Sequence, residues 1–155
     1  MYQIYNIYKM VFLHVNPSNP NTNLLNDAIN SGKSVFVLFY LEGCGPCNAT
    51  RPEWKKIENV LPKSNNIVIA DVDQSFIKSI RHLKPISGFP TIRFIKGRFS
   101  EDYEKSSIKV KDITIDSFVK WIKSKTTLGN KEGVKKSRKY KNRRKNNNTR
   151  KRRKQ

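Results

Sequence analysis

Short apolar runs, separated by segments with helical spacing, extend to about residue 125 of this 155-residue chain. Residues 35–40 are continuously apolar and residues 67–72 are apolar except for one aspartate, as expected of strands buried on both faces. The weakly alternating residues 11–15 are a candidate first strand. Residues 91–95 and the weaker run 99–103 flank a glycine turn, which predicts a hairpin.

Apolar residues recur at helical spacing in the segments between and after these strands. We expect helices over 22–31, 46–60 and 75–83, and a last helix from residue 114 onward. Pro52 lies inside the second of these helices, so a kink is expected there. This order of elements predicts an α/β fold, with a mixed sheet covered by helices on both faces.

Positive charge is concentrated at the C-terminus. The formal net charge is +20, and residues 131–155 contribute +13 of it through 14 Lys or Arg and one Glu. Beyond residue 128 only two residues are apolar, too few to form a core. We therefore divide the chain into an N-terminal segment, 1–21, one folded domain, 22–128, whose fold could begin at residue 11, and a basic, disordered tail, 129–155.

The N-terminal segment was considered as a signal peptide because residues 10–13 are apolar. It lacks a basic n-region, a long apolar h-region and a small-residue cleavage site, so we expect it to belong to the mature protein. No run approaches the ~20 apolar residues of a transmembrane helix. A cytoplasmic location is the expectation, with the nucleus as an alternative.

Both cysteines of the chain lie in the tetrapeptide Cys44-Gly45-Pro46-Cys47, between a predicted strand and a predicted helix. At a helix N-terminus the backbone N–H groups and the helix dipole lower the pKa of a thiol and favour the thiolate. The second cysteine is close enough to close a disulfide with the first. The pair is therefore suited to cycling between dithiol and disulfide.

A zinc half-site and a pair of buried structural thiols are the alternatives for these cysteines. Zinc needs four ligands, and His14 and His82 lie at no ligand spacing from the pair, so we expect no metal. His82 is expected to be an exposed or capping residue of the helix 75–83. Trp54 and Trp121 are expected in the core rather than in a substrate platform.

Residues 11–125 resemble the thioredoxin fold family. The resemblance rests on four features in order: the strand leading into the cysteine pair, a proline five residues after it, an Asp-x-Asp that ends the next strand, and a Gly-Phe-Pro-Thr sequence before a further strand. In this chain they are Cys44–Cys47, Pro52, Asp71–Asp73 and Gly88–Thr91. The surroundings of Trp54 and Trp121 are similar to domains of protein disulfide isomerases, whereas the Gly-Pro dipeptide is that of thioredoxins.

The resemblance implies roles for six residues. Cys44 would be the nucleophile and Cys47 the resolving cysteine, with Gly45 and Pro46 forming the active-site loop. In this fold the proline at the position of Pro90 is cis and lies against the disulfide, and the residue at Phe89 offers its backbone to an extended substrate strand. The redox-active disulfide would be the working group, so no separate cofactor is expected.

Two positions depart from the family pattern. Leu38 stands where the family places a buried carboxylate that takes the proton of the second thiol, and Gly43 replaces a tryptophan beside the first cysteine. Glu42 is the nearest carboxylate in sequence, but its loop position makes it a poor substitute. Slow resolution of mixed disulfides is therefore expected.

The first functional hypothesis is a protein disulfide reductase, acting as a monomer on protein disulfides and regenerated by an unidentified reductant. Reduction is favoured because the dipeptide between the cysteines lacks the histidine of the isomerases. The alternative is a thioredoxin-like binding module that residues 131–155 tether to nucleic acid or another polyanion, with weak redox activity. A basic tail on an Asn/Lys-rich redox domain also resembles redox proteins packaged by large DNA viruses, which adds the virion as an alternative location.

Overall fold

The computed structural model describes residues 11–62 and 64–126. The predicted N-terminal segment up to residue 10 and the predicted tail 129–155 lie outside these residues. The strands are β1 (Val11–Val15), β2 (Ser34–Tyr40), β3 (Ile67–Asp73), β4 (Thr91–Lys96) and β5 (Phe99–Asp102). The helices are α1 (Thr22–Asn30), α2 (Gly45–Lys55), α3 (Ile57–Val60) and α4 (Ile115–Lys125), with 3₁₀ helices at Gln74–Ser79 and Tyr103–Lys105.

The strands form one mixed sheet in the order β1-β3-β2-β4-β5. β1, β3 and β2 are parallel, whereas β4 is antiparallel to β2 and forms the predicted hairpin with β5. Every residue of the two central strands β2 and β3 is buried, in agreement with their apolar sequences. Because β1 belongs to the sheet, the sheet begins at Val11.

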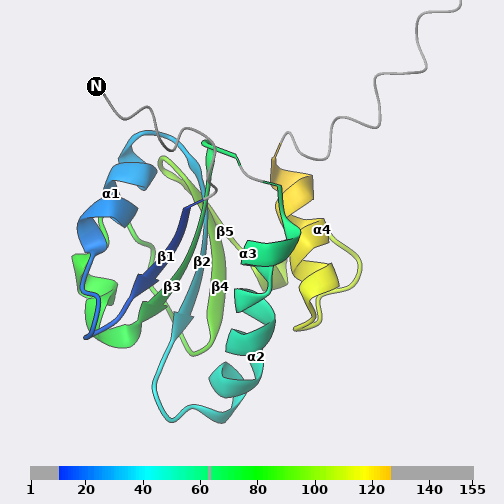
Figure 1. Cartoon of the computed structure of the whole chain (residues 1–155), viewed down its shortest axis with the longest axis horizontal. Coiled ribbons are helices and arrows are strands. Elements are labelled where there is room, and N and C mark those ends of the chain that lie inside the picture. The colour runs from blue at the N-terminus through cyan, green and yellow to red at the C-terminus, as the bar shows by residue number, and fades with distance from the viewer. Residues whose placement is uncertain (1–10, 63, 127–155) are drawn as a thin grey trace, which may run out of the picture.

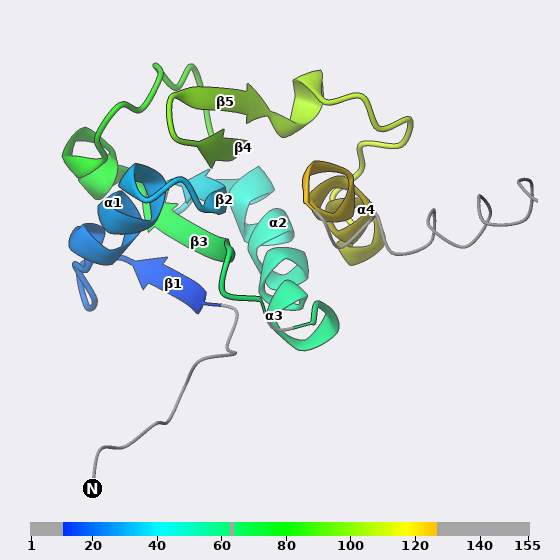
Figure 2. The ribbon, with the colours of Figure 1, turned by 90° about the horizontal axis from the view of Figure 1, so that it is seen from above.

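Helices cover both faces of the sheet, as predicted (Figures 1 and 2). α1 packs on one face, where its leucine and isoleucine side chains meet the valines of β2 and β3. α2, α3 and α4 cover the other face with a core rich in aromatic rings. Trp54 and Trp121 are fully buried in this core, which confirms their predicted place.

The helix predicted over residues 46–60 is divided in two. α2 continues through Pro52 and ends at Lys55, and α3 begins at Ile57. A proline inside a helix removes the hydrogen bond of its own N–H, and its ring crowds the carbonyl four residues earlier, yet α2 continues for three residues beyond Pro52. The interruption at Lys56 comes one turn later and is followed by the fully buried Ile57.

The helix predicted over residues 75–83 is also wrong in type and length. The structure has a 3₁₀ helix from Gln74 to Ser79, and Ile80 leaves it with extended backbone. The carboxylate of Asp73 caps this short helix by accepting the backbone N–H of Ser75 at 2.9 Å. His82 therefore lies outside any helix, in an exposed turn with φ of +58°.

Within the described parts of the chain, no helix is long and apolar enough to cross a membrane.

Candidate active site

The cysteine pair lies at the junction between β2 and α2. Gly43 precedes the first cysteine with φ of +77°, a conformation that side chains with a Cβ atom rarely adopt. The glycine that replaces the tryptophan of the family is therefore suited to this turn. Cys44 occupies the N-cap position of α2, and Pro46 stands in its first turn, where a missing N–H costs no hydrogen bond.

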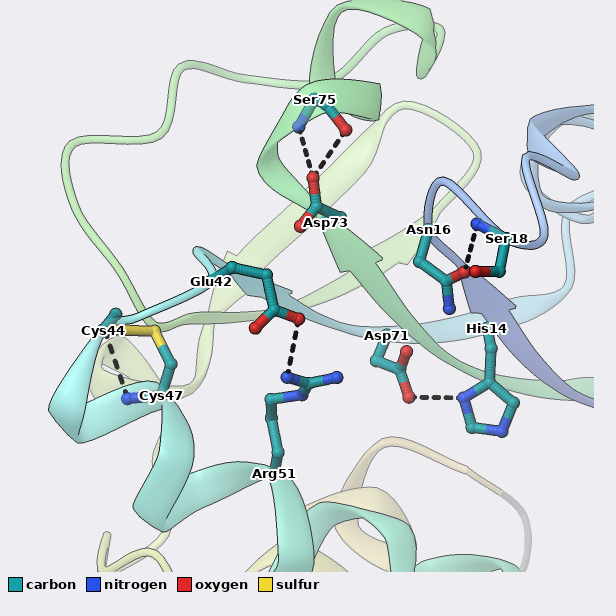
Figure 3. Close-up of polar contacts among 10 residues, drawn as sticks. All are labelled: His14, Asn16, Ser18, Glu42, Cys44, Cys47, Arg51, Asp71, Asp73 and Ser75. Atoms are coloured by element: carbon teal, nitrogen blue, oxygen red, sulfur yellow. Dashed lines mark hydrogen bonds and ion pairs between the residues drawn. A yellow bond between two sulfur atoms is a disulfide. The ribbon is translucent and has the colours of Figure 1, made fainter.

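Cys44 and Cys47 form a disulfide at the N-terminus of α2 (Figure 3). The sulfur of Cys44 accepts the backbone N–H of Cys47 at 3.2 Å. Cys44 is half-buried, whereas Cys47 is fully buried beneath the helix. In the reduced protein, the sulfur of Cys44 would face both solvent and the positive end of an eleven-residue helix, which stabilises a thiolate.

The loop that ends in Pro90 lies beside this disulfide. The carbonyl oxygen of Phe89 is 3.9 Å from the sulfur of Cys44, and the Phe89–Pro90 peptide bond is cis. The hydroxyl of Thr91 donates to the carbonyl of Gly88 at 2.7 Å. The structure thus brings residues from two distant parts of the sequence to one place, with the backbone of Phe89 next to the more open sulfur.

A buried carboxylate lies next to Leu38, on the adjacent strand. Asp71 of β3 pairs in register with Leu38 on one side and with His14 of β1 on the other. It is 2% exposed, and its carboxylate oxygen lies 2.7 Å from Nδ1 of His14. Burial raises the pKa of Asp71, while His14 and the more distant Lys55 and Arg51 oppose this rise. The sequence shows that position 38 carries no carboxylate. It does not show that a buried carboxylate, that of Asp71, lies beside Leu38 on the neighbouring strand.

Charged side chains of alternating sign lead from the cysteines toward Asp71. Glu42 is exposed and pairs with Arg51 at 3.2 Å, and the Arg51 guanidinium lies 3.9 Å above the ring of Tyr40. Figure 3 shows Glu42, Arg51, Asp71 and His14 following one another away from the disulfide. Sequence reasoning assigned no partner to Glu42 and no role to Arg51 or Asp71. An aspartate inside an apolar run was the available signal, because buried charges usually have partners.

Asp71→Asn is expected to raise the free energy of unfolding at neutral pH. Because burial raises the pKa of Asp71, the folded chain binds this proton more tightly than the unfolded chain, and stability falls as pH rises through the folded-state pKa. Each tenfold difference in proton affinity corresponds to about 1.4 kcal/mol. The gain of the variant over the wild type should be smallest below the ordinary aspartate pKa of 3.8 and grow above it. Urea denaturation over a pH series measures this difference.

Asp73→Asn is the matched control, on the same strand and the same face of the sheet. Its carboxylate accepts hydrogen bonds from the backbone N–H and the hydroxyl of Ser75, at 2.9 and 2.5 Å. Its replacement is therefore expected to lower stability. A stability difference between Asp71→Asn and the wild type that stays constant with pH would contradict the argument from burial.

A hollow of about 540 Å³ lies at the opposite end of the sheet from the cysteines. It is lined by residues at the start of β2 and β3 and the ends of β4 and α4, among them Lys33, Lys96 and Lys125. None of the residues that line this hollow belongs to the cysteine loop or to the segment around Pro90, so it is not part of the disulfide site. The disulfide instead lies beside the exposed residues Gly45 and Pro46, on a surface that a large substrate can approach.

Comparisons with known proteins show which sequences and structures the chain is similar to. The sequence profile of the thioredoxin family matches residues 13–124. The chain is 32% identical over 116 residues to a probable protein disulfide-isomerase A6 of Medicago sativa, covering 73% of this chain and 30% of that protein. It is 31% identical over 114 residues to the protein disulfide-isomerase of Drosophila melanogaster, covering 74% and 22%.

Among solved structures, the first thioredoxin domain of mouse protein disulfide-isomerase A4 aligns with a TM-score of 0.50 and 24% identity, covering 72% of each chain. This likeness concerns the fold. The chain spans less than a third of the length of the two curated relatives, 30% and 22%. It therefore corresponds to a part of those proteins, and their whole activities do not transfer with the match.

Proposed function

Because the chain belongs to the thioredoxin family, we propose that it is a thiol–disulfide oxidoreductase that acts on disulfides in proteins. One observation carries this proposal. The two cysteines form a disulfide at the N-terminus of α2, with the sulfur of Cys44 partly open and that of Cys47 buried. This asymmetry supports separate roles for the two sulfurs.

In the reducing direction, the thiolate of Cys44 attacks one sulfur of a substrate disulfide and forms a mixed disulfide, and the other substrate sulfur leaves as a thiolate. Cys47 then loses its proton, attacks the sulfur of Cys44, and releases the second substrate thiolate. Two electrons have passed to the substrate, and Cys44 and Cys47 are joined in the disulfide that the structure contains. An external reductant must reduce this disulfide before the next turnover.

The segment around Pro90 supports a peptide substrate rather than a small one. The backbone of Phe89 lies beside the sulfur of Cys44, where an extended peptide could pair with it while its disulfide is attacked. Reduction of insulin by the protein, with dithiothreitol as the electron source, is the direct test. No reduction above the dithiothreitol background would overturn the proposal.

The direction of exchange depends on the reduction potential of the pair. We expect a potential near the ~−270 mV of thioredoxin, and below the ~−180 mV of protein disulfide isomerase, because Gly45 and Pro46 separate the cysteines without a histidine. Equilibration with glutathione buffers, followed by alkylation of free thiols, measures it. Pro46→His is the matched variant and should raise the potential. A wild-type value above about −200 mV, within the oxidising range of such pairs, would contradict the reducing role.

The basic C-terminal residues favour a second, separate function. We propose that residues 131–155, with +13 of the +20 net charge, bind nucleic acid or another polyanion without sequence preference. The support is the charge density of the sequence. Such binding would hold the redox domain near polyanions and would leave the chemistry of the cysteines unchanged.

A further inference from the structure

A buried arginine on β4 holds the loop that carries Phe89 to the disulfide. This loop, residues 80–90, connects the first 3₁₀ helix to β4 and is called here the proline loop. Arg93 is only 4% exposed. Its guanidinium makes three contacts: Nε donates to Asp102 at 2.5 Å, and Nη1 and Nη2 donate to the backbone carbonyls of Lys84 at 2.5 Å and Pro85 at 3.1 Å.

These three contacts compensate for the burial of the positive charge of Arg93. A buried guanidinium without partners is strongly unfavourable, and here one carboxylate and two carbonyls replace its lost water. The fork of donors on an arginine is planar and rigid, so it fixes several acceptors relative to one another. Lys84 and Pro85 are thereby tied to Asp102, a residue of β5 in the regular part of the sheet.

The place of Arg93 in the sheet explains why it reaches this loop. Arg93 pairs in register with Val37, whose side chain belongs to the core on the α1 face. Leu83, Ile86 and Phe89 of the proline loop pack against the same core. Arg93 therefore points to the face that the loop crosses, and it lies three residues after Pro90 on the same chain.

The ends of the proline loop have other attachments. At its start, the side chain of Asn26 donates to the carbonyl of Ser79 at 2.9 Å and accepts the N–H of Arg81 at 2.8 Å. At its end, the hydroxyl of Thr91 donates to the carbonyl of Gly88. Arg93 supplies the polar attachment between them.

We propose that Arg93 is a positioning residue, which sets the backbone of Phe89 beside Cys44 and thereby determines how well protein disulfides bind. This inference rests on the proposed oxidoreductase function. Arg93 does not contact the sulfurs in the structure, so its effect is on substrates that use the proline loop. A small disulfide needs access to Cys44 alone, whereas an extended peptide also needs the Phe89 backbone at a fixed place.

The test compares two disulfides on one set of variants. Arg93→Met removes the fork at similar length, and Arg98→Met changes an exposed arginine of the β4–β5 turn as the matched control. For Arg93→Met we expect about a tenfold fall in kcat/KM for insulin, mainly through KM, because the lost hydrogen bonds involve a charged donor. The rate with 5,5′-dithiobis(2-nitrobenzoate) should change less than about twofold, since that reaction does not require a fixed loop. Arg98→Met should match the wild type with both.

Hydrogen exchange gives a readout that does not depend on turnover. The backbone amide of Arg81, which donates to Asn26 at the start of the proline loop, should exchange faster in Arg93→Met, with the amides of β2 and β3 little changed. If Arg93→Met does not fold, Arg93→Lys replaces it, because lysine keeps the charge but cannot reach the three acceptors with one planar fork. The same selective loss on insulin is then expected.

The outcomes separate this inference from the proposed function. A wild-type protein that does not reduce insulin above the dithiothreitol background would overturn the function, and with it the role of Arg93. An active wild type whose Arg93 variants keep the ratio of insulin to small-disulfide rates would overturn the positioning role alone. Equal losses on both disulfides would do the same, because they would show a general structural effect.

Discussion

Cys44→Ser is expected to abolish reduction of protein disulfides, and Cys47→Ser is expected to accumulate covalent mixed disulfides with its substrates. Cys44 is the half-buried sulfur at the N-cap of α2 and is the expected attacking thiolate, whereas Cys47 is fully buried. Without Cys44 no bond to the substrate forms, so the rate should fall to the background of the added dithiol. Without Cys47 the first step proceeds but the internal resolving thiol is missing.

Insulin turnover measures the first effect, and non-reducing gel electrophoresis with mass spectrometry measures the second. Asn48→Ser is the matched control, since this exposed residue follows Cys47 on the same helix. It should retain activity and trap nothing. Equal trapping by the two cysteine variants would show that the attacking sulfur has been assigned wrongly, and trapping by Cys44→Ser alone would reverse the two roles.

Removal of the charge on residues 131–155 is expected to eliminate most affinity for nucleic acid while leaving disulfide reduction nearly intact. This part of the sequence carries +13, against +7 for the rest of the chain. A full-length variant with Gln in place of the Lys and Arg residues of segment 131–155 tests the charge without shortening the protein. If six to ten phosphates are contacted, binding by the wild type should weaken by about 10³–10⁵-fold between 50 and 200 mM salt.

An electrophoretic shift assay over a salt series, with several unrelated DNA sequences of equal length, provides the measurement. Equal affinity for these sequences is expected, because phosphate contacts do not read bases. Retained binding by the Gln-substituted variant would place the contact surface on the folded domain. Binding by the wild type that is indifferent to salt would contradict the electrostatic origin.

The strands of the fold and the position of the cysteines are local properties, and the sequence alone determined them. The continuous apolar runs of β2 and β3 predict buried central strands, and the glycine at position 97 predicts the β4–β5 hairpin. The spacing of Cys44 and Cys47 at a strand-to-helix junction predicts redox chemistry for the same reason. A hydrophobic period and a tetrapeptide depend on neighbours in the chain, which the sequence displays directly.

Element ends and helix types were less predictable. The apolar pattern of 46–60 continues across Lys56, where the helix is interrupted, and the pattern of 75–83 fits a helix although the chain forms a 3₁₀ helix and then a turn at His82. Small differences in free energy decide such ends, and packing of single residues such as Ile57 contributes to them.

The surroundings of the cysteines depend on contacts between residues far apart in the sequence, and only the tertiary structure decided them. The sequence alone shows that position 38 is a leucine and not an acidic residue. That Asp71 lies beside it and is paired with His14 follows from the order β1-β3-β2 and from the register of these strands. In the sequence Arg93 is a charged residue of a predicted strand. Its hydrogen bond to the carbonyl of Lys84 requires the proline loop to cross the face of the sheet to which Arg93 points. Strand order and register arise from packing the whole core at once, so no local pattern contains them.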